Sequence, residues 1–177
     1  MFHFCSELLH TRTPLLTGTD VESKREEIRN YFHQTFSLYE KLFDVLASDQ
    51  TYYMQPEKLR HPLIFYAGHT AVFFINKLRL AGLLSDRINE SMESTLAVGV
   101  DEMSWDDLNC GNYVWPSVDE VHKYRDMCRV VVDDLISSLP LTLPITWESP
   151  FWVILVRTQT EQTVAGININ SYRPLAR

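Results

Sequence analysis

His69 is the residue that most needs a chemical explanation, because it lies inside the apolar run RHPLIFYAGHTAVFF at residues 60–74. An imidazole binds a transition metal through one ring nitrogen, or it lies in a core with one hydrogen-bond partner. The metal interpretation needs further ligands, usually a pair of histidines at i and i+4 on another helix. The sequence contains no such pair. Spacing alone therefore favours a core histidine and leaves the metal ligand as the alternative.

The remaining histidines do not supply a clear second ligand. They are His3, His10, His33, His61 and His122. His33 and His122 are each alone on a predicted helix. His61 precedes His69 by eight residues, which corresponds to about 80° around a helix, so the two rings do not easily share one metal.

Two pairs of carboxylates are further candidates for chemistry. Asp106 and Asp107 lie in a long predicted connection, where they either cap a turn or take part in function. Asp133 and Asp134 are expected on the solvated face of a helix. Nothing in the sequence resembles a nucleophile elbow, a P-loop or a dinucleotide-binding fingerprint.

The three cysteines form neither a disulfide framework nor a zinc motif, because their number is odd and their spacing shows no pairs. They are Cys5, Cys110 and Cys128. We expect structural rather than nucleophilic roles for them. The N-terminal stretch has no basic region and no small-residue cleavage site, so it does not resemble a signal peptide. Together these features predict a reducing, cytoplasmic setting.

Length and composition predict one globular domain, because 177 residues with 45% apolar side chains are enough for a substantial core. The net charge of -7 disfavours nucleic acid or an anionic membrane as the main partner. No apolar run reaches the roughly 18 residues that a membrane-spanning helix needs.

Four long helices are predicted from apolar spacing and from their capping residues. The first begins after Asp20 and fades near Ala47, and its aromatic stripe is expected in the core. The second begins near His61 and Pro62, is apolar on most sides and ends near Gly82. The third follows Ser117, with Glu120 completing a capping box. The fourth begins near Ser149, with Pro150 at its first position.

Less regular segments separate these helices. Residues 1–19 are expected to be irregular and residues 49–60 to form a loop. The connection 85–116 is long, with a short helix from about 86 to 97. Four helices, one long crossover and no convincing strand pair predict an all-α four-helix bundle, in which metal sites are built from side chains that face the axis.

Four motifs in order resemble the N-terminal DinB-like domain of ovothiol synthases. They are HPLIFYAGHTAVFFINKL, GVDEMSWDDLN, WPSVDEVHKYR and LPLTLPITWESPFWVIL, and the resemblance runs from about residue 20 to Leu155. These enzymes, also called 5-histidylcysteine sulfoxide synthases, are relatives of the ergothioneine enzyme. The resemblance implies a DinB-like four-helix bundle at 20–165 and non-haem Fe(II) held by three histidines. It also implies O2-dependent joining of the sulfur of cysteine to the imidazole ring of histidine. His69, in the GHTA motif, is then the first iron ligand.

The sequence departs from the family after SPFWVIL. The family has its other two ligands in an EHExxH stretch there, whereas the ungapped register places Thr160 and Val164 at those positions. Neither side chain is a useful iron ligand, and no histidine follows His122. The family also continues into a formylglycine-generating-enzyme-like catalytic domain that this sequence lacks. We therefore expect this chain to be catalytically inactive and to hold no stable Fe(II).

The abrupt end of the similarity suggests that the tail, 166–177 with the residues just before it, arises from splicing, a frameshift or a gene-model error. Transcript sequencing across the codon for Leu155 tests this hypothesis. One alternative function is a non-catalytic binding or regulatory bundle that pairs with itself or with a full-length homologue. A weaker alternative is a DinB-like thiol-handling protein with another metal. The sequence assigns no role to Asp101, Trp105 or Asp106.

Overall fold

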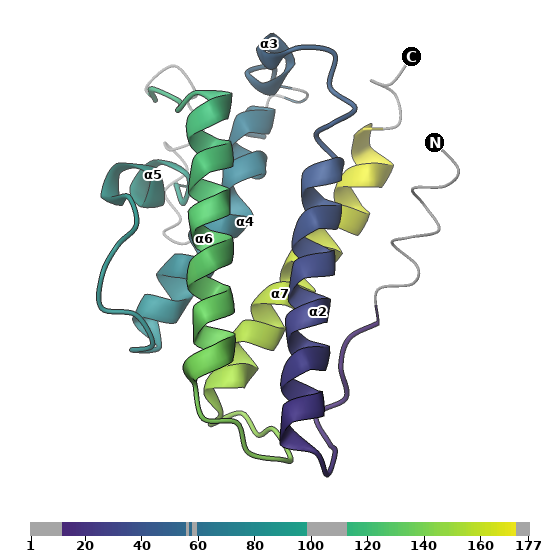
Figure 1. Ribbon diagram of the computed structural model, residues 1–177. Helices are drawn as coiled ribbons and strands as arrows, with labels where there is room; N and C mark the ends of the chain where they lie inside the picture. Colours follow the sequence, from purple (N-terminus) through teal and green to yellow (C-terminus); the bar gives the residue numbers. More distant parts are fainter. Residues whose placement is uncertain (1–11, 56, 58–59, 99–112, 173–177) are drawn as a thin grey trace. The chain divides into compact units, whose positions relative to one another are not determined.

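The computed structural model describes residues 12–55, 57, 60–98 and 113–172, with the backbone alone at 162–172. Within these ranges it contains helices and no strand, so the predicted all-α class is confirmed (Figure 1). The helices are α2 (Val21–Lys41), α3 (Asp49–Tyr52), α4 (Leu63–Leu80), α5 (Glu90–Thr95), α6 (Val118–Ser138) and α7 (Pro150–Tyr172).

The chain forms two compact units. One, here called the His69 unit, is Leu46–Cys128, and the other, here called the terminal unit, combines Met1–Val45 with Arg129–Arg177. The division falls within α6, so residues 118–128 of this helix belong to the His69 unit and residues 129–138 to the terminal unit.

Two of the predicted helix starts, those of α2 and α6, are confirmed by their capping contacts. The Asp20 side chain accepts a hydrogen bond from the Ser23 amide at 3.1 Å. At the start of α6, the Ser117 amide donates to the Glu120 carboxylate at 2.8 Å, and the Glu120 amide donates back to the Ser117 hydroxyl at 3.3 Å. This pair is the predicted capping box, and it satisfies amide groups that have no partner within the helix.

Three boundaries differ from the sequence prediction. The short helix expected from about 86 to 97 is α5, which spans only Glu90–Thr95. Residues 49–60 were expected to form a loop, but they contain α3, a single turn too short to show apolar periodicity. The first helix was expected to reach about Ala47, whereas α2 ends at Lys41. The apolar spacing continues past this end because Phe43 remains buried and packs against Tyr39, with ring centroids 5.5 Å apart.

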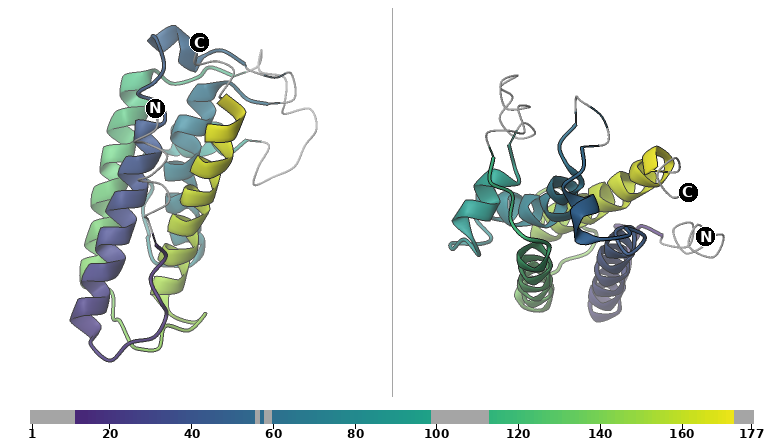
Figure 2. Two further views of the ribbon diagram at one scale, coloured as in Figure 1. Left: turned by 90° about the vertical axis from the view of Figure 1, so that its right-hand side faces the viewer. Right: turned by 90° about the horizontal axis from the view of Figure 1, so that it is seen from above.

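The core of the terminal unit lies between α2 and α7, which pack against each other (Figures 1 and 2). The predicted aromatic stripe of α2 is buried there. Its fully buried members include Phe32, Phe36 and Tyr39, and α7 contributes Phe151 and Ile154.

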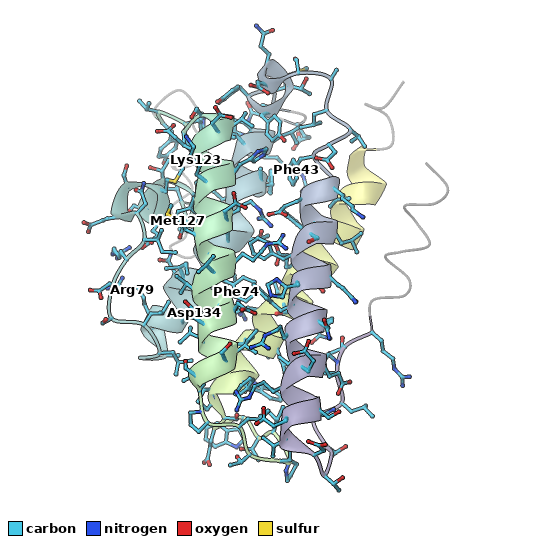
Figure 3. All side chains as sticks on the ribbon, in the orientation of Figure 1. Phe43, Phe74, Arg79, Lys123, Met127 and Asp134 are labelled. Carbon is cyan, nitrogen blue, oxygen red and sulfur yellow. The ribbon has the colours of Figure 1, made fainter. Side chains whose placement is uncertain are left out.

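The core of the His69 unit is built around α4, which is buried on most sides, as predicted. The largest buried side chains of α4 are Leu63, Ile64, Phe65, Phe74, Ile75 and Leu78. The first half of α6 adds Val121 and Tyr124. Lys123 and Met127, on the other side of α6, are exposed (Figure 3).

Candidate functional site

The imidazole of His69 is fixed by a hydrogen bond to the backbone. Its Nδ1 lies 2.7 Å from the carbonyl oxygen of Leu96, and the residue is half-buried. A carbonyl oxygen only accepts, so Nδ1 carries the proton. In the neutral ring the lone pair is therefore on Nε2. Histidines that bind metals commonly have this arrangement, with one ring nitrogen donating to a carbonyl while the other is the ligand atom.

Two aromatic rings fix the plane of the His69 ring. Phe65 stacks on it at 4.9 Å with an interplanar angle of 14°, and Phe73 stacks at 5.5 Å and 25°. Both are four residues from His69 on α4, so helical spacing brings the three rings into one column. Stacking and the Leu96 hydrogen bond together leave the imidazole little rotational freedom.

The Leu96 carbonyl reaches His69 because α4 carries a glycine beside it. A Cβ atom added at Gly68 would lie 2.5 Å from Leu96 Cδ1 and 3.4 Å from Val121 Cγ1. Leu96 itself is fully buried, and its amide donates to the Met92 carbonyl at 2.9 Å. The glycine therefore permits a close approach between α4 and the end of α5 that no larger residue allows without displacement.

Glu93, on α5, is only 1% exposed, and its carboxylate accepts hydrogen bonds from several groups. Its Oε1 accepts from the Ile88 amide at 2.8 Å, the Asn89 amide at 3.0 Å and the Tyr124 hydroxyl at 3.3 Å. Its Oε2 accepts from Arg87 Nη1 at 3.1 Å. Burial, followed by nearby Cys128 and Glu93, raises the pKa of Tyr124, so its hydroxyl remains a proton donor.

Arg125, 2% exposed, joins α6 to α4 in the same unit. Its Nη1 donates to the Ala67 carbonyl at 3.1 Å and to the Thr70 hydroxyl at 2.9 Å. One turn along α6, the buried thiol of Cys128 donates to the Ala71 carbonyl at 3.5 Å. This contact agrees with the structural role predicted for Cys128.

Sequence reasoning missed Glu93 and Arg125. Arg125 was detectable, because it lies four residues after Val121 on the apolar stripe of α6 and therefore faces the core. Glu93 gave no signal, because it lies in a polar stretch where a carboxylate normally points to solvent.

Two of the other candidate histidines, His61 and His33, contact neighbours of different kinds. His61 is buried against Phe65, with ring centroids 4.2 Å apart, and against Trp115 at 5.7 Å. In the terminal unit, His33 Nε2 lies 2.8 Å from Asp133 Oδ1, which also accepts from Arg29 Nε at 3.1 Å. The predicted solvated face holds only in part for Asp133: its side chain is 34% exposed but is paired, because it lies on the side of α6 that approaches α2.

Asp134, beside it, is exposed as expected (Figure 3). The pair Asp106 and Asp107 lies outside the described residues. So do Cys5, Cys110, Asp101 and Trp105.

The two positions that replace iron ligands lie on α7. The Thr160 hydroxyl donates to the Val156 carbonyl at 2.8 Å, one helical turn before it. The side chain of Val164 lies outside the described part of the chain, although its backbone belongs to α7. In the parts that the structure describes, no three histidine, cysteine or carboxylate side chains gather as a metal site would require.

Comparisons with known proteins assign the chain to no family. No protein-family model matches the sequence, and no curated protein matches it. Among the described helices, none is long and apolar enough to cross a membrane.

Proposed function

We propose that this chain is a DinB-like four-helix bundle related to the N-terminal domain of ovothiol synthases, with His69 as a remnant iron ligand. The observation that supports this most is the hydrogen bond from His69 Nδ1 to the Leu96 carbonyl. It leaves the lone pair on Nε2, which is the common arrangement of a metal-binding imidazole whose Nδ1 donates to a carbonyl. A purely structural histidine in a core needs only one hydrogen-bond partner, which either ring nitrogen can contact. The bond between His69 Nδ1 and the Leu96 carbonyl is compatible with that role, but a structural role does not require this particular nitrogen.

A second observation supports the register in which Thr160 and Val164 replace the ligands. In that register Glu161 falls on the second glutamate of the EHExxH motif. Glu161 is buried, at 1% exposure, which is unusual for a glutamate on a helix. Burial, and more weakly the charge of Glu161, raises the pKa of Tyr31 on α2, so this carboxylate faces the interior of the terminal unit.

The donor set does not fit Fe(II). The hydroxyl of Thr160 is neutral and donates to the helix backbone, and valine has no donor atom. One imidazole does not hold Fe(II) against water, so we expect neither stable iron binding nor sulfoxide synthesis from cysteine and histidine by this chain alone.

The test restores the missing ligands. Anaerobic Fe(II) titration compares the natural chain, the double variant Thr160→His/Val164→His, and that variant with His69→Ala added. We expect one equivalent of Fe(II) to bind the double variant and no saturable binding to the other two proteins. A folded double variant that binds no more iron than the natural chain would contradict the family relationship.

A second candidate function is a non-catalytic bundle that associates with itself or with a full-length homologue. Large apolar side chains at the surface favour it, including Leu80 at 81%, Val114 at 93% and Trp147 at 75% exposure. Light scattering coupled to size-exclusion chromatography should then show a mass that rises with protein concentration. A monomer at every concentration would eliminate self-association.

A further inference from the structure

The position of the Leu96 carbonyl needs an explanation outside α5 itself. This helix has six residues, and a helix so short is not stable on its own. Leu96 is its C-cap, and the carbonyl of this residue determines where the His69 proton resides. Contacts to neighbouring elements must therefore hold α5 in place.

Glu93 makes several of these contacts. Its carboxylate binds the amides of Ile88 and Asn89 and so fixes the start of α5. The same carboxylate accepts from Tyr124 on α6. The backbone carbonyl of Glu93 accepts from Asn76 Nδ2 on α4 at 3.2 Å. One residue therefore connects α5 to both long helices of the His69 unit.

Leu96 follows Glu93 by three residues, so it lies one turn further along the same helix. The Leu96 side chain packs against Gly68, directly beside His69. A shift of α5 by a fraction of an ångström would therefore lengthen the 2.7 Å bond between the Leu96 carbonyl and His69 Nδ1.

We propose that Glu93 is a positioning residue for His69, because it holds the Leu96 carbonyl against Nδ1 and thereby selects the tautomer with its lone pair on Nε2. An imidazole in water prefers its proton on Nε2, so the preference must be reversed by the protein. The functional meaning of this tautomer rests on the proposed ancestry of His69 as an iron ligand, but the tautomer itself is measurable without metal.

The experiment is a long-range 1H–15N correlation spectrum of metal-free protein labelled with 15N-histidine. It is recorded near pH 8.5, about two pH units above the ordinary pKa of histidine, so that neutral rings dominate. His69→Ala identifies the His69 signals. The natural chain should show His69 with its proton on Nδ1.

Glu93→Ala should shift the ratio of the two His69 tautomers toward Nε2–H by roughly tenfold, as expected from losing one buried hydrogen bond. Glu90→Ala is the matched control, because Glu90 is on the same helix but exposed, and it should leave the ratio unchanged. A folded Glu93→Ala protein that retains the Nδ1–H form would overturn the proposal.

If Glu93→Ala does not fold, the double variant Asn76→Ala/Tyr124→Phe decides. It keeps Glu93 but removes the donor on α4 to its backbone carbonyl and the donor on α6 to its carboxylate. A shift toward Nε2–H supports the proposal, and an unchanged ratio rejects it. The spectrum contains no iron, so a negative result would refute the role of Glu93 without affecting the outcome of the Fe(II) titration.

Discussion

The His69 unit and the terminal unit each contain a cluster of polar side chains that joins helices, and the two clusters differ in burial. Glu93 and Arg125 are almost completely inaccessible to solvent and bind backbone groups and hydroxyls. In the terminal unit, Arg29 forms an ion pair with Asp133 and His33 lies within hydrogen-bond distance of the same carboxylate, and each of the three side chains is about a third exposed. The buried contacts of Glu93 and Arg125 should therefore fix the positions of their helices more firmly than the contacts around Asp133 do.

A buried hydrogen-bonded carboxylate is costly to disturb, because its partners lose their bonds where water does not replace them. A half-exposed ion pair contributes little, because water and salt compete for both charges. The contrast predicts that removing the Glu93 carboxylate changes both stability and the geometry at His69, whereas removing the Asp133 charge changes stability only slightly.

Glu93→Ala should lower the free energy of unfolding by about 3 kcal/mol, because two amides, a hydroxyl and a guanidinium lose their acceptor. Urea denaturation followed by circular dichroism measures this change. Glu90→Ala should stay within about 0.5 kcal/mol of the natural chain. Equal effects of the two substitutions would mean that the buried network does not stabilise the unit.

Gly68→Ala should cost about 2 kcal/mol, because the added methyl group overlaps Leu96 in a filled core. The same substitution should weaken the bond between Leu96 and His69, so the His69 NMR signals should shift. Gly82→Ala is a useful comparison, since Gly82 has open space around it but a φ of 71° that disfavours alanine. It should destabilise α4 without changing the His69 signals.

Asp133→Asn should cost less than about 1 kcal/mol, since its partners are half-exposed and exchange the bond for water. The difference from the natural chain should shrink further at 1 M salt. Asp134→Asn, on the exposed side of α6, is the control and should have no measurable effect. An effect of Asp133→Asn that is large and independent of salt would contradict the proposed contrast.

Glu120→Gln should have the smallest effect, and that effect should depend on pH. Hydrogen bonds from Ser117 lower the pKa of Glu120 below its usual 4.5. The folded state therefore favours the carboxylate, and this contribution is present above pH 4.5 and lost as the pH falls through the lower folded-state pKa. Denaturation of both proteins across this range should show a small difference at neutral pH that vanishes in acid.

Local features of the fold could be predicted from the sequence, and long-range features could not. Asp20 and the Ser117–Glu120 box act within one turn, so their residue types are sufficient to predict helix starts. The bond between His69 and Leu96 joins residues 27 positions apart and depends on the packing of Gly68. No periodicity encodes such a contact, so the sequence identified the histidine and left its partner unknown.

A single NMR spectrum compares the tautomers of one histidine from each unit. In a long-range 1H–15N spectrum of the natural chain near pH 8.5, where histidine is ordinarily neutral, His69 should carry its proton on Nδ1. His33 should carry it on Nε2, because that nitrogen faces the Asp133 carboxylate. Opposite tautomers would support a built ligand geometry at His69. A His69 ring protonated on Nε2, or an equal mixture, would contradict it.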